Sequence, residues 1–551
     1  MVPGRGLALA WLACASAAYL SHTRVPTPTG RCRAPRACSE DWRDVRARLV
    51  KQEQAEAMGA PEAEDGAPGG EEYVFATPLI EQGSVILGGT QQEFGFALRQ
   101  QYFHKSVMLL LQHDEQFTKG IILNRPSALE LDGWRVWFGG DVAEGGFFKG
   151  VAEAVGEREI VCLHSLESEE ARRLSLQVIR GVSQTTLAGA QSLVASGAAS
   201  KSDFWLFVGY AGWAPKQLEG EVERDSWFLA AADSAVLLRE LLRQGTELPP
   251  PSESSTAGDG LATWERLMES IGKGDEVTRT RGSLEDRILK EWVRVNLLPR
   301  APPADGGPLL PEKVEGLVLR SGHDGGSFTL GEQFMHKSLC LVLAGVPDGP
   351  CLGAVLNRPT ANVVQFNLPS RPRRCIHFGG EARVKSGLDI DANGLLWLHH
   401  SADLGGAPIG DSGVYRIAAS DAANLVKDGA AALDDFLLVA GIQAWSREAL
   451  QALMARGDLV PVADGAALWD QIWALGGGGG GSDDAAQEAS ELSDGTALWW
   501  AATQQKASQT VGAVSSTQTL PSSRLADEAL AQWLHFFAGH PERGEEPVGG
   551  A

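Results

Sequence analysis

Short apolar runs, separated by polar or glycine-containing turns, recur along the first half of the chain and predict β-strands. Residues 106–111 and 120–123 are two such runs, and the polar segment 113–116 between them predicts a β-hairpin. Residues 160–164 and 204–209 are further apolar runs of strand length. These runs predict a β-sheet at the centre of this half of the chain.

Helical composition follows the strands. Residues 167–183, 216–222, 264–272 and 284–292 are predicted helices, and Pro215 stands where a first helical residue is expected. Strands and helices mixed in this way indicate an α+β fold. We expect a mixed, barrel-like sheet core with helices packed around it.

The same pattern returns in the second half of the chain. The string Leu-Asn-Arg-Pro at 123–126 stands again at 356–359. Four other matching pairs of segments stand in the same order, and the second member of each pair lies between 232 and 240 residues after the first. They are His-Lys-Ser (104–106, 336–338), Phe-Gly-Gly (138–140, 378–380), Leu-His (163–164, 398–399) and the segments 204–213 and 436–445. Ordered matches of this kind predict a tandem duplication of one globular unit. We also match Trp469 to Trp264, and the closing helix 525–533 to 284–292.

Composition divides the chain into seven parts. They are a targeting segment (1–38), an acidic linker expected to be disordered (39–77), unit 1 (78–300), a Pro/Gly linker (301–313), unit 2 (314–476), a flexible Gly/Ser-rich segment (477–520) and the C-terminal helix of unit 2 (521–540). Each unit is long enough to bury a core of its own. The sequence leaves open whether the two units pack as an intramolecular pseudo-dimer.

Charge and cysteine usage narrow the function classes. The net charge of −22 over 551 residues counts against nucleic-acid partners, because a protein that binds phosphates needs a basic surface. The seven cysteines are scattered without a Cys-x-x-Cys pair, so neither a disulfide framework nor a metal site is predicted, and no cofactor is expected. Beyond the N-terminal segment no apolar run reaches the ~18 residues of a membrane helix.

Residues 1–38 have the composition of a targeting sequence. Arg5 precedes an apolar run at 7–20 that ends in small residues, as in a secretory signal peptide. The rest of the segment holds four further arginines and no acid, which is typical of a transit peptide. The combination resembles the bipartite presequence of algae with secondary plastids, so we predict a plastid protein. Secretion with a disordered leader is the alternative.

Five strings of unit 1 stand out: Phe-His-Lys-Ser-Val (103–107), Gly-Ile-Ile-Leu-Asn-Arg-Pro (120–126), Phe-Gly-Gly (138–140), Leu-His (163–164) and Gly-Tyr-Ala-Gly-Trp-Ala-Pro-Lys-Gln-Leu-Glu (209–219). Together they resemble the AlgH-like (YqgE/AlgH) family of small α/β proteins. The resemblance covers residues 80–275 and, in weaker form, 314–476. Asp141 and Glu381 stand where the family usually has proline. At 441–450, unit 2 lacks the tyrosine, the second glycine and the proline of the longest string.

The resemblance implies a fold more firmly than an activity. One bacterial member is named as a transcriptional regulator of alginate synthesis, and the family has no established catalytic residues. We therefore expect a non-catalytic binding or regulatory protein of the plastid, with no specific partner predicted. Two alternatives stay open. One is an unrecognised enzyme with unit 1 active and unit 2 decayed, and the other is a transcriptional regulator, against which the acidic charge counts.

The candidate ligand-binding residues come from the two most distinctive strings and are Asn124, Arg125, Gly209, Tyr210, Gly212, Trp213 and Gln217. A glycine turn that leads into a helix start can bind an anion, and an arginine can pair with one. The structural alternative is a turn with a satisfied arginine and close packing of strand on helix. Unit 2 keeps Leu-Asn-Arg-Pro and loses the longest string, so a ligand site is better sought at 209–217, with Arg125 as its neighbour at most.

No catalytic residue is assigned. Ser106 lacks the Gly-x-Ser-x-Gly setting of a nucleophile elbow. The enzyme alternative requires His104, His164 and Arg125 to converge in a cleft of unit 1. Otherwise we expect His104 and Lys105 to lie at a solvated entry to a strand.

Overall fold

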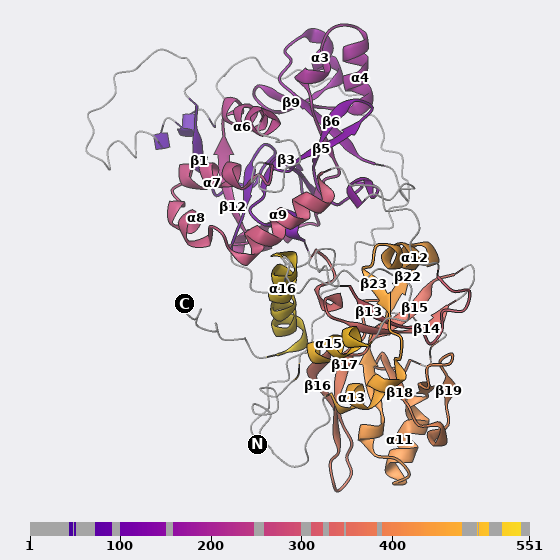
Figure 1. The fold of residues 1–551 in the computed structure, drawn as a ribbon. Coiled ribbons are helices and arrows are strands. Elements are labelled where there is room, and N and C mark those ends of the chain that lie inside the picture. Colours follow the sequence, from indigo (N-terminus) through magenta and orange to yellow (C-terminus); the bar gives the residue numbers. More distant parts are fainter. Residues whose placement is uncertain are drawn as a thin grey trace, which may run out of the picture.

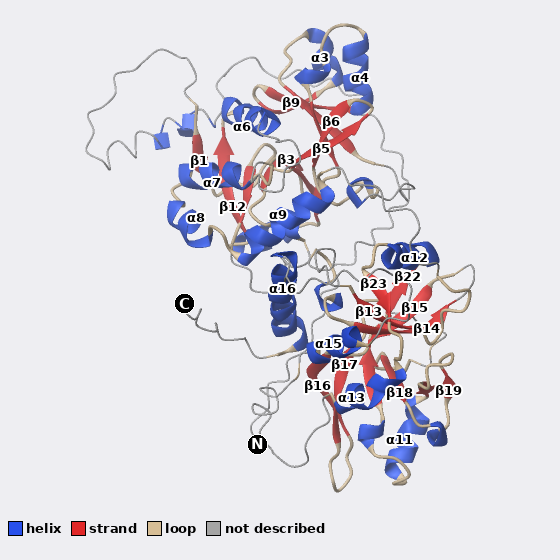
Figure 2. Cartoon of the chain, viewed as in Figure 1, coloured by secondary structure: helices blue, strands red, loops and turns tan. Residues whose placement is uncertain are grey.

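Two sheet-containing units follow one another along the chain (Figures 1 and 2). The computed structural model describes residues 72–90, 100–149, 158–246, 258–298, 310–322, 330–345, 349–382, 388, 390–475, 493, 495–505 and 521–540, together with parts of 43–50. The predicted targeting segment and most of the acidic linker lie outside the described residues.

Two six-stranded sheets form the core of unit 1. The first has the order β1-β12-β2-β3-β4-β11, and its neighbouring strands are antiparallel. The second has the order β5-β6-β10-β7-β9-β8, and in it β10 runs parallel to β6. The strands are β1 (Val74–Ala76), β2 (Val85–Gly88), β3 (Val107–His113), β4 (Thr118–Ile122), β5 (Pro126–Leu131), β6 (Trp134–Phe138), β7 (Ile160–His164), β8 (Leu176–Ile179), β9 (Val182–Thr186), β10 (Trp205–Val208), β11 (Ala211–Trp213) and β12 (Trp227–Ala232).

The predicted hairpin is formed by β3 and β4. Alternate residues of β3 enter two different core clusters, Met108 in one and Leu109 in the other, so both faces of this strand are covered. The Asp114 carboxylate accepts the backbone N–H groups of Gln116 (2.8 Å) and Phe117 (3.0 Å) and so closes the turn. The hairpin prediction is confirmed.

Seven α-helices surround the sheets of unit 1 in the part of the chain that is described (Figure 2). They are α3 (Glu169–Leu174), α4 (Leu187–Ala195), α5 (Gln217–Glu223), α6 (Ser234–Thr246), α7 (Leu261–Ser270), α8 (Gly274–Thr280) and α9 (Leu284–Asn296), with 3-10 turns η1 (Gln101–Phe103), η2 (Phe147–Lys149) and η3 (Lys201–Asp203). The helices predicted near 216–222, 264–272 and 284–292 are confirmed as α5, α7 and α9. However, α5 begins at Gln217, after Lys216 in the left-handed conformation, so Pro215 is not its first residue.

The helix predicted over 167–183 is wrong beyond Leu174. Ser168 caps the helix start by accepting the N–H of Ala171 (3.2 Å), and the helix then lasts only six residues. The chain continues as the hairpin β8–β9. Gly181 sits in its turn with a left-handed φ of 82°, which glycine adopts without steric cost.

Unit 2 has a similar arrangement, except that its first sheet has, among the described residues, five strands and no counterpart of β1. Its first sheet has the order β22-β15-β14-β13-β23, and its second has the order β16-β17-β21-β18-β20-β19 with β17 parallel to β21. The strands are β13 (Val318–Ser321), β14 (Leu339–Gly345), β15 (Cys351–Val355), β16 (Pro359–Gln365), β17 (Arg373–Phe378), β18 (Leu395–His399), β19 (Ala407–Pro408), β20 (Tyr415–Ile417), β21 (Leu437–Ala440), β22 (Gln443–Trp445) and β23 (Leu459–Pro461). The α+β class is confirmed, and the described sheets are open rather than closed barrels.

The helices of unit 2 correct one match made from the sequence. They are α11 (Ala419–Lys427), α12 (Arg447–Ala455), α13 (Trp469–Ala474), α15 (Thr496–Gln504) and α16 (Pro521–Ala538), with 3-10 turns η4 (Gln333–Met335), η5 (Ala402–Leu404), η6 (Leu433–Asp435) and η7 (Ala466–Leu468). Trp264 donates to the carbonyl of Gly88 at the end of β2 (2.9 Å), and Trp499 donates to Ser321 at the end of β13 (2.8 Å). The counterpart of Trp264 is therefore Trp499, not Trp469, and a helix of the fold stands inside the segment predicted as flexible.

The closing helices of the two units contact one another. Figure 1 shows α9 of unit 1 beside α16 of unit 2, and Ile288 of α9 is fully buried in a core cluster whose other buried members belong to unit 2. Within the described residues, no helix is both long enough and apolar enough to cross a bilayer.

Candidate functional site

The Asn-Arg-Pro string lies where β4 ends and β5 begins. The side-chain oxygen of Asn124 accepts the N–H of Val107 (2.8 Å), and its amide nitrogen donates to the carbonyls of Lys105 (3.0 Å) and Gly260 (2.8 Å). Gly260 is the residue before α7. One buried amide therefore joins a strand end, the start of β3 and the start of a helix, with both its donors and its acceptor in use.

Arg125 completes this clamp from the same turn. It donates to the carbonyls of Asn124 (2.9 Å), Asp259 (3.0 Å) and His104. The side chain is fully buried, and burial lowers the pKa of its guanidinium to about 9. The guanidinium therefore crosslinks backbone carbonyls from three segments, which stabilises the turn.

Unit 2 makes the same clamp. Asn357 accepts the N–H of Leu339 (2.8 Å) and donates to Lys337 (3.0 Å) and Gly495 (2.8 Å), while Arg358 donates to the carbonyl of Asn357 (2.9 Å). The bonds of Asn357 match those of Asn124 one for one, and Arg358 also donates to the carbonyls of Phe334 (3.0 Å) and His336, which supports the structural role of the string. All four clamp side chains have no exposed surface. A contribution of the string in unit 1 to a ligand site stays a prediction.

A buried cluster of three polar side chains joins α9 to the rest of unit 1. One Asp286 oxygen lies 2.8 Å from His104 Nε2 and 2.8 Å from Lys105 Nζ. Lys105 also donates to the Thr280 carbonyl (2.9 Å) and lies over the ring of Trp264. The exposed fractions of the three residues are 3% or less. The expectation of a solvated strand entry at the His-Lys pair is therefore wrong.

These groups determine one another's ionisation. Burial alone would raise the pKa of Asp286, but the hydrogen bonds from His104 and Lys105 outweigh it and lower that pKa to about 2. Burial is the largest influence on the pKa of His104 and lowers it, with help from the charge of Lys105 and against the effect of Asp286. At neutral pH the cluster is consequently a lysine–carboxylate ion pair beside a neutral imidazole.

Unit 2 holds a looser version of the cluster. Asp527 on α16 lies 2.8 Å from His336 Nε2 and 2.5 Å from Lys337 Nζ. Its side chain is 41% exposed, against 3% for Asp286. The contact between the closing helix and the His-Lys pair is therefore shielded from water in unit 1 and partly open to water in unit 2.

His164 lies in the other sheet of unit 1. Its Nε2 is 2.7 Å from the Ser175 hydroxyl, and its Nδ1 accepts the N–H of Leu166 (3.2 Å). Among the described residues, no hydrogen bond or ion pair joins it to His104 or Arg125. The three side chains that the enzyme alternative requires are therefore not brought together by direct contact.

Gly209 owes its place to a close crossing of two backbones. It adopts φ 78°, and a Cβ at this position would lie 2.1 Å from the Gly140 carbonyl oxygen. In unit 2, a Cβ on Gly441 would lie 2.0 Å from the Gly380 carbonyl. Both glycine pairs are therefore needed for the fold itself, whatever else the string in unit 1 does.

Tyr210 belongs to a half-buried cluster on the surface of unit 1. Lys119 of β4 places its ammonium 4.5 Å from the centre of the Tyr210 ring and pairs with the Glu159 carboxylate. Phe117 meets the same ring edge-on at 6.3 Å, and a Cβ on Gly212 would lie 2.8 Å from Phe117. Burial lowers the pKa of Lys119 and raises that of Tyr210. The result is a cation, a carboxylate and two aromatic faces at one partly open place.

The remainder of the string forms a hydrogen-bonded corner beside this cluster. Glu221 accepts from the indole N–H groups of Trp213 (2.9 Å) and Trp227 (2.8 Å) and from the side-chain amide of Gln217 (2.9 Å). Gln217 is exposed, and its oxygen accepts the N–H of Ala214 (3.1 Å) at the start of α5. The structure therefore gathers Gly209, Tyr210, Gly212, Trp213 and Gln217 along one edge of unit 1.

Sequence reasoning missed the groups that give this edge its charge. Lys119 faces Gly212 across the β4–β11 pair, and its counterpart Leu352 faces Ala444 across β15–β22. Tyr210 and Glu159 give way to Ile442 and Gly394 in unit 2. The two units differ in sequence at these three positions. That difference identifies the charged edge only when the strand register shows that the three residues lie together. We call Lys119, Glu159 and Tyr210 the lysine cluster.

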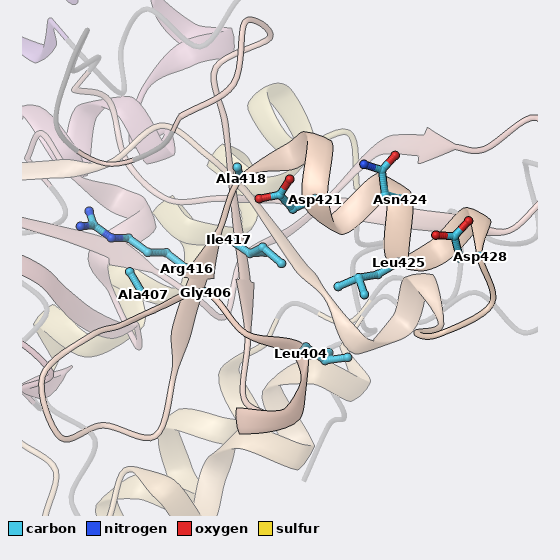
Figure 3. Close-up of a pocket in the computed structure, with 10 residues that line it drawn as sticks. All are labelled: Leu404, Gly406, Ala407, Arg416, Ile417, Ala418, Asp421, Asn424, Leu425 and Asp428. Atoms are coloured by element: carbon cyan, nitrogen blue, oxygen red, sulfur yellow. The ribbon is translucent and has the colours of Figure 1, made fainter.

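Two hollows lie away from the lysine cluster. The larger, of about 470 Å³, opens in unit 2 between β20 and α11. Figure 3 shows Asp421 and Asn424 projecting from the helix, Asp428 from its C-terminal end and Arg416 from the strand. In unit 1 the helix α3 packs against α4 at the corresponding place, whereas unit 2 has only the short turn η5. The second, of about 430 Å³, lies between α6 and α7 and is lined by Arg239, Glu240, Arg243, Arg266 and Glu269, among others.

Comparison with known proteins places unit 1 among bacterial relatives. A family model described as AlgH-like matches residues 95–247. A UPF0301 protein of Streptomyces avermitilis is 31% identical over 144 residues, which are 25% of this chain and 71% of that protein. A UPF0301 protein of Burkholderia mallei is 29% identical over 151 residues, covering 24% of this chain and 71% of that protein.

Two solved structures also resemble the chain. The solution structure of the AlgH protein of Pseudomonas aeruginosa is 21% identical and covers 29% of this chain and 82% of its own, with a TM-score of 0.23. A crystal structure of a protein of Corynebacterium diphtheriae is 20% identical and covers 31% of this chain and 90% of its own, with a TM-score of 0.22.

Proposed function

Because this chain belongs to the AlgH-like family, we propose that it is a non-catalytic binding protein of the plastid with a regulatory role. Unit 1 carries the ligand site at the lysine cluster and the neighbouring edge from Gly209 to Gln217. Unit 2 carries no equivalent site and serves as its attached partner. The observation that carries this proposal is the lysine cluster, a half-buried group of charged and aromatic side chains that unit 2 replaces with Leu352, Gly394 and Ile442.

The chemistry of the lysine cluster favours a small anion that carries a flat apolar part. Only 17% of the Lys119 side chain is exposed, so water screens its charge less than it would at an open surface. In the absence of ligand its ammonium is paired with Glu159, which is 43% exposed and free to swing away. A carboxylate or phosphate could take the place of Glu159, while the rings of Tyr210 and Phe117 pack against the apolar part.

The test is a thermal-shift screen of small acidic metabolites on the full chain. A ligand at 100 times its Kd stabilises the folded state by about 2.7 kcal/mol, which for a unit of this size raises Tm by about 5–10 °C. Lys119→Leu copies Leu352 of unit 2 and should abolish that shift. Lys201→Leu is the matched control, because Lys201 also lies over an aromatic ring, that of Trp134 at 5.4 Å, but away from the string. A shift that survives Lys119→Leu would contradict the proposal.

One observation favours the enzyme alternative. A lysine whose pKa is lowered by burial is a better proton acceptor or nucleophile at neutral pH than an exposed one. If the purified chain turns over a metabolite and Lys119→Leu abolishes that turnover, unit 1 is an enzyme. The binding proposal is then wrong.

The plastid assignment rests on the composition of residues 1–38 and needs its own test. We expect a fluorescent protein fused behind these residues to enter the plastid of an alga with a secondary plastid. A second fusion behind residues 1–20 alone should be secreted. Secretion of both fusions would contradict a plastid location.

A further inference from the structure

The two closing helices meet at positions that correspond between the units. α9 and α16 align at a spacing of 241 residues, at which Asp286 matches Asp527, the carboxylate that binds the His-Lys pair of its own unit. At this spacing Arg287 matches Glu528. These two side chains pair with each other through two hydrogen bonds, one of 3.0 Å from Arg287 Nη1 and one from Nη2.

Contact between equivalent positions indicates a two-fold axis, because in a symmetric pair a residue meets its own copy only beside the axis. The neighbouring positions agree. Leu284 and Leu525 correspond, and both pack against the cluster that contains the next corresponding pair, Ile288 and Ala529. The helices α9 and α16 therefore cross about a pseudo-two-fold axis that passes beside the Arg287–Glu528 pair.

We propose that this crossing is a selective interface that joins unit 1 to unit 2 and rejects the pairing of like units. Two unit-1 faces would bring arginine against arginine at the axis, and two unit-2 faces would bring glutamate against glutamate. The pair Ile288 and Ala529 adds a difference in size, since two isoleucines would overfill the space and two alanines would leave a void. The occupant of each helix face is the other unit of the same chain.

Selectivity, rather than stability, is what the charged pair contributes. The side chains of Arg287 and Glu528 are 46% and 45% exposed, so water screens their attraction. Reversal of one charge nevertheless turns attraction into repulsion at the same distance. The apolar contact of Ile288 holds the helices together, and the charges decide which helices may meet.

The experiment is a double-mutant cycle in the full chain with Arg287→Glu, Glu528→Arg and the double variant. Both positions are half-exposed, so neither change threatens the folding of its own unit. Hydrogen exchange of α9 and α16 reports the separation of the helices, and small-angle X-ray scattering reports the distance between the units. Each single variant should speed exchange of the facing amides by on the order of fivefold and increase the radius of gyration.

The double variant should return both measurements to wild-type values, because it restores an opposite pair in reversed order. Arg279→Glu on α8 removes an exposed pair within unit 1 and should change neither measurement. Single variants without effect would overturn the proposal. So would a double variant whose effect is the sum of the two singles, since the two positions would then not interact.

Discussion

Replacement of Asp286 with asparagine would leave the buried ammonium of Lys105 without a counter-charge. Removal of one partner from a buried ion pair costs about 3–5 kcal/mol in the free energy of unfolding. The lowered pKa of Asp286 agrees in direction, since a pKa of about 2 in place of 3.8 corresponds to roughly 2–3 kcal/mol of preferential stabilisation of the carboxylate.

The matched control is Asp527→Asn in unit 2. The Asp527 side chain is 41% exposed, so water takes over much of its role and the loss should be about 1 kcal/mol or less. For units of this size each kcal/mol changes Tm by about 2–4 °C. We expect Asp286→Asn to lower the Tm of unit 1 by about 10 °C and Asp527→Asn to lower that of unit 2 by no more than about 4 °C.

Hydrogen exchange read by mass spectrometry assigns each loss to its unit. The peptides of η1 and β3 should lose protection in Asp286→Asn, and those of η4 and β14 should not. Lys105→Met combined with Asp286→Asn removes both charges and should recover at least half of the loss. Equal losses for Asp286→Asn and Asp527→Asn, or no recovery in the double variant, would refute the buried ion pair as the cause.

The pH dependence has a definite sign. The pKa of Asp286 is lower in the folded chain than in the unfolded one, so the contribution of its ion pair is complete above about pH 4 and is lost as the pH falls toward 2. The lowered pKa of His104 acts in the same direction. The unfolded imidazole takes up a proton near pH 6.5 before the folded one does, so stability falls as the pH drops below that value.

Three substitutions and one labelling experiment test other parts of the fold. Asn124→Ala leaves one N–H and two carbonyls buried without partners, so it should cost about 3 kcal/mol or more in urea unfolding, and Asn357→Ala should cost as much in unit 2. Gly209→Ala places a methyl group 2.1 Å from a carbonyl oxygen and should abolish soluble expression of unit 1. Burial raises the pKa of the Cys162 and Cys375 thiols to about 12 and about 11, so both should resist alkylation at pH 8 until the chain unfolds.

The parts of the fold that the sequence predicted well depend on short-range patterns. Apolar runs of strand length found β3, β4, β7 and β10, because a strand covered on both faces is a continuous apolar stretch. The segment after Leu174 was wrongly predicted as helix because its local pattern is ambiguous. Its polar and apolar residues do not alternate clearly, and only the left-handed glycine at 181 marks the hairpin.

The groups that the sequence did not reveal pair over long distances. Asp286 lies 181 residues beyond Lys105, and no local pattern identifies it as the counter-charge. The repeat contained a usable clue, since Asp286 and Asp527 stand at the same place in the two closing helices. The sequence gives a weaker clue to Lys119 than to Asp286. It is one polar residue in a strand, and only the register with β11 places it under the Gly-Tyr-Ala-Gly-Trp string.

Unit 2 lacks the lysine cluster but still contributes to the stability of unit 1. Both keep the asparagine–arginine clamp and the His-Lys pair with its aspartate, which are needed for folding. Unit 2 also buries Ile288, an apolar residue on the face of α9 that points away from unit 1. Exposure of such a side chain costs about 1.5–3 kcal/mol, and α9 is the helix that delivers Asp286 to Lys105. Unit 2 therefore supports the buried ion pair of unit 1 through one helix.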